Sequence, residues 1–120
     1  MTLDEYNVFC GGLAHATHVV QWGDAHVWKI GGKVFAIAGW QDGDELGVTF
    51  KTSELSFEIL KDQQGCRPAP YLAARGMKWI QRTGYETLSD DDLREYLQKS
   101  YQLVGSGLTK KKQRELGLIA

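Results

Sequence analysis

Apolar residues near the start of the chain recur first at helical spacing and then in strand-like runs. The residues from Thr2 to Glu5 have the sequence of a capping box, and the apolar positions after them return every three or four residues up to Leu13. The pair Gly11-Gly12 is a typical stop for such a helix. We therefore predict a short, one-sided helix at the N-terminus, followed by strands.

Two apolar runs, 26–30 and 33–40, flank the pair Gly31-Gly32. A Gly-Gly pair between such runs is typical of a two-residue β-hairpin, because both turn residues need a positive φ. This loop fixes the register and pairs Ile30 with Lys33, Trp28 with Phe35 and His26 with Ile37. Trp28, Ile30, Phe35 and Ile37 are therefore expected to face the core, and Val27, Lys29, Val34 and Ala36 to lie on the other face.

The alternation of apolar and polar residues from Leu46 to Lys51 predicts a half-buried strand. Thr52 or Ser53 then caps a second helix, which carries Leu55, Ile59 and Leu60. The segment 66–71 follows, and its two prolines exclude it from helices and inner strands because proline lacks a hydrogen-bond donor.

The run 77–82 is predicted as the last strand, and two registers are open for it. We expect Trp79 to face the helices, because a tryptophan buries more apolar area than an isoleucine. Met77, Trp79 and Gln81 then share the inner side, and Lys78, Ile80 and Arg82 face outward beside Lys29. The alternative register buries Ile80, leaves Trp79 on the open face and turns Lys78 and Arg82 inward against carboxylates.

Ser89 and the three aspartates after it predict the N-terminus of a third helix, which ends at Gly105-Ser106-Gly107. The tail 108–120 is a basic extension or one short helix. The whole order predicts an α+β fold, with an antiparallel sheet packed on helices. A length of 120 residues suits a single domain, 1–120.

The composition limits the classes of function that the protein can have but does not identify one. The net charge is −1, so any attraction for phosphate must come from local patches. The two cysteines have no metal or disulfide spacing and are predicted to be buried, reduced thiols. We see no signal-peptide pattern and no apolar run near the roughly 20 residues of a membrane helix, so a cytoplasmic protein is expected.

The ordered set of motifs resembles the MmcQ/YjbR family of small bacterial proteins. The residues that carry the resemblance are the hairpin 27–36, the strand 48–51 before a capped helix, Pro68-Ala69-Pro70-Tyr71, and the segment 100–104 before the basic tail. The resemblance implies a CyaY-like fold, related in shape to frataxin. It also implies a DNA-binding protein with a double-wing arrangement.

The basic residues are unevenly distributed, which suggests where DNA would bind. No acidic residue occurs between Gln63 and Tyr85, where cations alternate with aromatic residues, and a second basic cluster lies in the tail. Cations beside aromatic rings are what a nucleic-acid surface needs. The predicted nucleic-acid-binding residues are Arg67, Arg75, Lys78, Arg82, Lys110, Lys111, Lys112 and Arg114. The competing interpretation is that these side chains are solvated surface charges.

A second hypothesis is a protein-interaction or small-ligand module with no nucleic-acid role, which uses the sheet face around Val27, Val34 and Ala36 or a pocket near Tyr71. No nucleophile elbow, P-loop or dinucleotide motif is present, so we expect no enzyme and no cofactor. The histidines His15, His18 and His26 match no zinc template, and surface histidines are favoured over a metal site.

Overall fold

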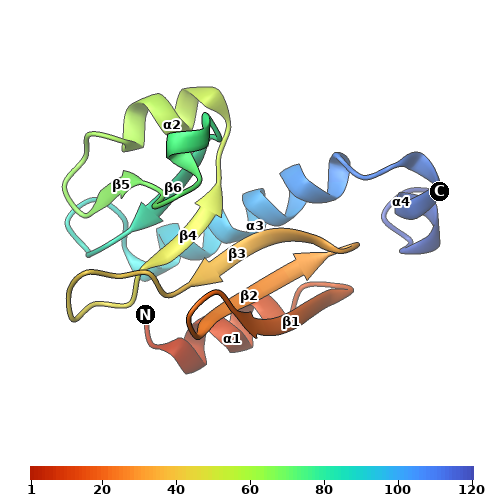
Figure 1. The fold of residues 1–120 in the computed structure, drawn as a ribbon. Coiled ribbons are helices and arrows are strands. Elements are labelled where there is room, and N and C mark those ends of the chain that lie inside the picture. The colour runs from red at the N-terminus through yellow and green to blue at the C-terminus, as the bar shows by residue number, and fades with distance from the viewer.

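The computed structural model describes residues 1–120 as one six-stranded antiparallel sheet with helices packed against it (Figure 1). The elements are α1 (Leu3–Gly11), β1 (Ala16–Gln21), β2 (Ala25–Ile30), β3 (Lys33–Ala38), β4 (Val48–Lys51), α2 (Glu54–Leu60), β5 (Cys66–Pro68), the 3-10 turn η1 (Ala73–Arg75), β6 (Trp79–Arg82), α3 (Asp90–Ser106) and α4 (Lys110–Glu115). The strand order is β1-β2-β3-β4-β6-β5. The predicted α+β class is confirmed.

Local capping places the helices where the sequence predicts them. Thr2 and Ser89 each form a complete capping box, and Ser53 accepts a hydrogen bond from the backbone of Ser56. The apolar face of α2 differs from the prediction, because Phe57 and Leu60 are buried while Leu55 and Ile59 are exposed. Phe57 and Leu60 are three residues apart and so share the face that meets the sheet.

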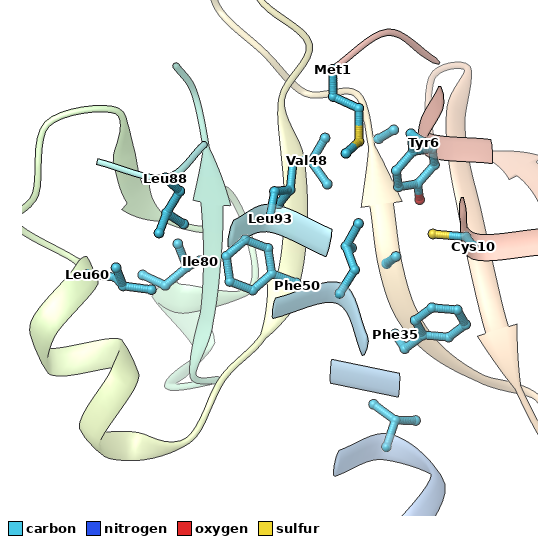
Figure 2. Close-up of a cluster of buried hydrophobic side chains, with 14 of the residues drawn as sticks. Met1, Tyr6, Cys10, Phe35, Val48, Phe50, Leu60, Ile80, Leu88 and Leu93 are labelled. Atoms are coloured by element: carbon cyan, nitrogen blue, oxygen red, sulfur yellow. The ribbon is translucent and has the colours of Figure 1, made fainter. Parts of the chain in front are cut away.

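The main core lies between the sheet and the helices α1, α2 and α3 (Figure 2). Phe35, Phe50 and Ile80 come from β3, β4 and β6, and Leu93 enters between them from α3. Tyr6 of α1 is fully buried on the same side of the sheet. Helices therefore cover one face of the sheet only.

The predicted hairpin register is correct at the turn and wrong beyond it. Ile30 pairs with Lys33, and a β-bulge then inserts Phe35, so that Trp28 pairs with Ala36 instead of Phe35. A bulge adds one residue to one strand and exchanges the two faces of everything that follows. Ala36 therefore joins the main core and Ile37 the opposite face, which is the reverse of the prediction.

Ser100 of α3 bridges β3 and β4 next to their last paired residues, Ala36 and Phe50. Its hydroxyl donates to the carbonyl of Phe35 at 2.6 Å and accepts from the backbone N–H of Lys51 at 2.9 Å. Ser100 is completely buried. A helix side chain thus satisfies two backbone groups that the sheet ladder does not pair.

The favoured register of the last strand is wrong. β6 spans Trp79–Arg82, and Ile80 pairs with Phe50 on the core side while Trp79 pairs with Lys51 on the other side. The alternative register is therefore the observed one. Trp79 is nevertheless only 5% exposed, so it offers no accessible ring on the open face. The expected outward position of Arg82 is also wrong, because its side chain turns into the protein. Part of the proline segment forms the edge strand β5, which is consistent with its predicted exclusion from helices and inner strands.

Candidate binding face on the open side of the sheet

We call the side of the sheet that carries no helix the open face. A small apolar cluster of Ala25, Val27 and Ile37 forms its base, and Leu72, in the connection between β5 and β6, packs against it. Tyr71 precedes Leu72, and η1 follows it. The connection thereby packs across part of the open face.

Charge is segregated between the sheet and the rest of the chain. The strands contain no acidic residue, although the chain has 15 acidic and 14 basic residues. The basic strand residues are Lys29, Lys33, Lys51, Arg67 and Arg82. Lys29 pairs with Val34, and Lys51 pairs with Trp79, which places both lysines on the open face. Neither lysine forms an ion pair with a carboxylate.

Arg82 is not available to a ligand. Its side chain is 0% exposed, and Nη2 lies 3.0 Å from Oδ1 of Asp90, while Nη1 donates to the carbonyl of Leu88 at 3.2 Å. The guanidinium also lies 4.5 Å from the centre of the Tyr85 ring. Arg82 is therefore a structural residue, and its prediction as a DNA contact is wrong.

Arg67 lies on the open face, where its side chain holds the neighbouring loop. Nε donates to Gln81 at 2.6 Å, Nη1 contacts Asp42 at 3.1 Å, and Nη2 donates to the carbonyl of Trp40 at 3.0 Å. The guanidinium of Arg67 thus donates to groups of the protein itself. Its bond to the carbonyl of Trp40 helps to hold the backbone at that residue.

The other predicted cations do not form one surface. Lys78 is half-buried, with Nζ 4.9 Å from the centre of the Phe57 ring, so it lies toward α2. The cluster Lys110, Lys111, Lys112 and Arg114 belongs to α4, which lies at the end of the molecule opposite β5 (Figure 1). Leu108 and Leu116 hold this tail against the turn at Gly31. Only Arg75 of the predicted set lines a cleft on the open face.

We call that cleft the aromatic cleft. It has a volume of about 630 Å³ and is lined by Trp22, Gly23, Trp40, Tyr71, Leu72 and Arg75. The rings of Trp22 and Trp40 are 5.9 Å apart, and Tyr71 meets Trp40 edge-on at 5.3 Å. Trp22 is 52% exposed and Tyr71 is 71% exposed. Such exposure is unusual for large aromatic side chains, which dominate cores and interfaces.

The backbone at this cleft is held in an uncommon conformation. Trp22, Trp40 and Tyr71 have φ values of 55°, 63° and 69°, in the left-handed region that bulky residues rarely adopt. Each such residue costs on the order of 1 to 3 kcal/mol and persists only where the surroundings impose it. Strain of this kind clusters at binding sites. Of the five non-glycine residues with a positive φ, these three line the aromatic cleft.

A second cleft lies at the border between the open face and the end of α3. It has a volume of about 350 Å³, and its lining residues are Lys33, Val34, Lys51, Met77, Trp79, Leu103, Val104 and Gly107. Lys33 and Lys51 therefore border the open face at this second cleft, as Arg75 does at the aromatic cleft. Aromatic surface and unpaired cations lie on one face of the protein.

The aromatic cleft was only partly foreseen from the sequence. Tyr71 was expected near a pocket, but nothing in the pattern grouped it with Trp22 and Trp40. A usable signal was present, because these tryptophans lie next to Gly23 and Gly39 in turns, where a large apolar residue has no core to enter.

The buried cysteines lie on the helix side and away from these clefts. Burial raises the pKa of the Cys10 thiol to about 12. Burial also raises the pKa of Cys66 to about 11, although Arg82 opposes the shift. Both thiols stay protonated at neutral pH, as expected for the buried, free cysteines that the sequence predicts.

Comparison with solved structures supports the fold. The DR2400 protein of Deinococcus radiodurans, which carries a DUF419 domain, superposes with a TM-score of 0.82 at 28% identity, over 97% of this chain and 88% of that one. A protein from Pseudomonas syringae matches with a TM-score of 0.69 at 16% identity, over 87% of this chain and 99% of that one, which concerns the fold alone. No curated protein matches the sequence.

No helix of the structure is long and apolar enough to cross a membrane. The sequence matches the YjbR family over residues 11–103, a range that runs from the end of α1 into the last turns of α3 and includes every residue that lines the aromatic cleft. This agrees with the resemblance that the sequence motifs carry. The chain belongs to the YjbR family.

Proposed function

We propose that this protein is a non-catalytic nucleic-acid-binding module that contacts DNA through the open face, with unpaired bases stacked in the aromatic cleft. The observation that carries the proposal is the exposure of Trp22 and Tyr71 beside Arg75, which has no carboxylate partner. Proteins that bind single strands combine aromatic rings for the bases with cations for the phosphates. Stacking on rings is tolerant of sequence, so little base preference is expected.

The charge pattern supports this placement over the one predicted from the sequence. Arg75, Lys29 and Lys51 lie on or beside the open face, where the strands contribute no opposing carboxylate. Three phosphate contacts to a single strand give a slope of about −2 in a plot of log affinity against log salt. A chain with a net charge of −1 can bind only through such a local surface.

The test is a titration of fluorescently labelled single-stranded DNA and of the matching duplex, at low and at moderate salt. We expect the single strand to bind more tightly than the duplex, because only unpaired bases can enter the aromatic cleft. Arg75→Glu and Trp22→Ala should each weaken binding. Both residues are exposed, so the variants should fold normally.

Lys110→Glu is the matched control for Arg75→Glu, because it makes the same change of charge on α4, away from the open face. It should leave the affinity nearly unchanged. The proposal fails if no binding is seen at low salt with tens of micromolar protein, or if Lys110→Glu weakens binding as much as Arg75→Glu does.

The size of the aromatic cleft favours a second candidate function, the binding of a small planar ligand. A volume of about 630 Å³ lies within the range of small-molecule sites. This function would show little dependence on salt and would tolerate Arg75→Glu, while Trp22→Ala would still abolish binding. The same set of variants therefore separates the two functions.

A further inference from the structure

A third cleft lies between the start of α2 and the helix α3. We call it the α2–α3 cleft, and it has a volume of about 380 Å³. Its lining includes Lys51, Ser53, Ser56, Tyr96 and Lys99, and no acidic residue contributes to it. The α2–α3 cleft shares no residue with the aromatic cleft, so the two are separate candidate sites.

Two lysines from distant parts of the chain line the α2–α3 cleft without a carboxylate partner. Lys51 is the last residue of β4, and Lys99 belongs to α3. Nζ of Lys99 lies 5.3 Å from the centre of the Tyr96 ring, and neither lysine forms an ion pair. Like charges that border one small volume repel each other. An anion that enters the cleft removes this repulsion.

Hydroxyl groups lie beside the two ammonium groups. Oγ of Ser53 accepts a hydrogen bond from the backbone N–H of Ser56, so its own hydrogen is free to donate. Ser56 and Tyr96 bring further hydroxyls to the cleft. Ammonium and hydroxyl donors without a competing carboxylate match the oxygen atoms of a phosphate group.

The second cleft adjoins the α2–α3 cleft, because Lys51 and Leu103 line both. Its lining is mainly apolar and includes Val34 and Met77, and Lys33 adds a further cation. A molecule whose anionic end lies in the α2–α3 cleft therefore meets apolar side chains next to that end.

We propose that these two adjoining clefts bind a phosphate monoester that carries a small apolar body. The phosphate lies between Lys51 and Lys99, and the apolar body lies against Met77 and Leu103. A phosphate monoester carries close to two negative charges at pH 7, which two lysines neutralise. The phosphodiester of a DNA backbone carries only one charge for each phosphate, so this ligand differs from the one proposed for the open face.

Isothermal titration calorimetry with hexyl phosphate tests the site, and inorganic phosphate and 1-hexanol represent the two halves of this probe. We expect hexyl phosphate to bind more tightly than either half, because only the complete molecule occupies both clefts. In amide NMR spectra, it should shift the signals of residues 51–56 and 99–106 and leave those of Trp22 and Tyr71 unchanged. An alkyl chain has no ring to stack in the aromatic cleft.

Lys99→Gln should raise the Kd for hexyl phosphate by about three- to tenfold, because it removes one of the two charged contacts to the phosphate. Leu103→Glu should also weaken binding, because it places a carboxylate where the two clefts meet. Lys110→Gln is the matched control for Lys99→Gln, since it makes the same change at an exposed position on α4. Lys99, Leu103 and Lys110 are all exposed, so the three variants should fold normally, which circular dichroism verifies.

Several results would overturn the site. One is the absence of both heat and NMR shifts at about ten millimolar hexyl phosphate, and another is an equal loss of affinity in Lys99→Gln and Lys110→Gln. Hexanol that binds as tightly as hexyl phosphate would exclude recognition of the phosphate, and inorganic phosphate that does so would exclude a role for the second cleft. Arg75→Glu should weaken DNA binding but leave hexyl phosphate binding unchanged, so this proposal and the DNA proposal can fail independently.

Discussion

Nη2 of Arg82 lies 3.0 Å from Oδ1 of Asp90, and the guanidinium is fully excluded from solvent. The contact is an ion pair without the angle of a hydrogen bond, so its attraction is mainly electrostatic. It joins the end of β6 to the start of α3. An arginine that the sequence presents as a surface cation is thus the anchor between a strand and the longest helix.

Arg82→Ala should destabilise the protein by about 2 to 5 kcal/mol, because it leaves a cavity at a fully buried position and removes one of the two cations that face Asp90. Chemical denaturation followed by circular dichroism measures the loss. Arg75→Ala is the control, since the same substitution at an exposed position should cost less than about 0.5 kcal/mol. Equal effects of the two variants would contradict the structural role of Arg82.

The stability of the protein should fall in acid because of Asp90. Burial raises the pKa of its carboxyl, but the Met1 amino group and Arg82 lower it by more, so the pKa in the folded state lies below the ordinary value. Such a group stabilises the fold above its unfolded pKa of about 3.9, and the contribution is lost as the pH falls through the folded pKa. Asp90→Asn should therefore be less stable than wild type at pH 7.

The difference in unfolding free energy between wild type and Asp90→Asn should shrink as the pH drops below about 4. Urea denaturation at a series of pH values from neutral to acidic measures it. A difference that stays constant, or that grows in acid, would show that Asp90 makes no favourable charge contact in the folded state.

Trp22→Gly should separate stability from binding. Glycine adopts the φ of 55° at this position without steric cost, and the lost tryptophan is half-exposed, so stability should be unchanged or higher by up to about 1 kcal/mol. DNA affinity should fall, because a stacking ring is lost. Thermal denaturation and the single-strand titration give the two values. A variant that is clearly less stable would mean that Trp22 is needed for the fold.

Ser100→Ala should destabilise the protein by about 1 to 3 kcal/mol, since it leaves the carbonyl of Phe35 and the N–H of Lys51 buried without partners. Hydrogen exchange should also become faster at the Lys51 amide. Ser106→Ala in the last turn of α3 is the control, because that serine is exposed and its hydroxyl bonds only to the Leu103 carbonyl of its own helix. Its substitution should have little effect on either measurement.

Local features of this protein could be predicted from the sequence because they depend on neighbouring residues. The capping boxes at Thr2 and Ser89, the turn at Gly31-Gly32 and the edge position of the proline segment all follow from backbone requirements within a few residues. The class of the fold follows from their order. The motifs were also sufficient to place the chain in the YjbR family.

Which side chains of β3 and β6 point into the main core depended on contacts between residues that are far apart in the sequence. Phe35 could enter the core as a bulge because Ser100, 65 residues away, satisfies its carbonyl. Trp79 is buried although it lies on the side of β6 away from the main core, and Arg82 could turn inward because Asp90 faces its guanidinium. The larger apolar area of Trp79 compared with Ile80 was therefore not sufficient to predict the register of β6.

The candidate sites show the same division. Residue types alone indicated that cations and aromatic rings would form a binding surface, but not which of them would share a face. Arg67 and Arg82 bind other groups of the protein through their guanidinium groups. Trp22, Trp40 and Tyr71 come from three separate turns and line one cleft. The sequence determines which local structures and chemical groups the chain has. Only the tertiary structure decides which groups stay free and meet, because desolvation and pairing depend on neighbours that are distant along the chain.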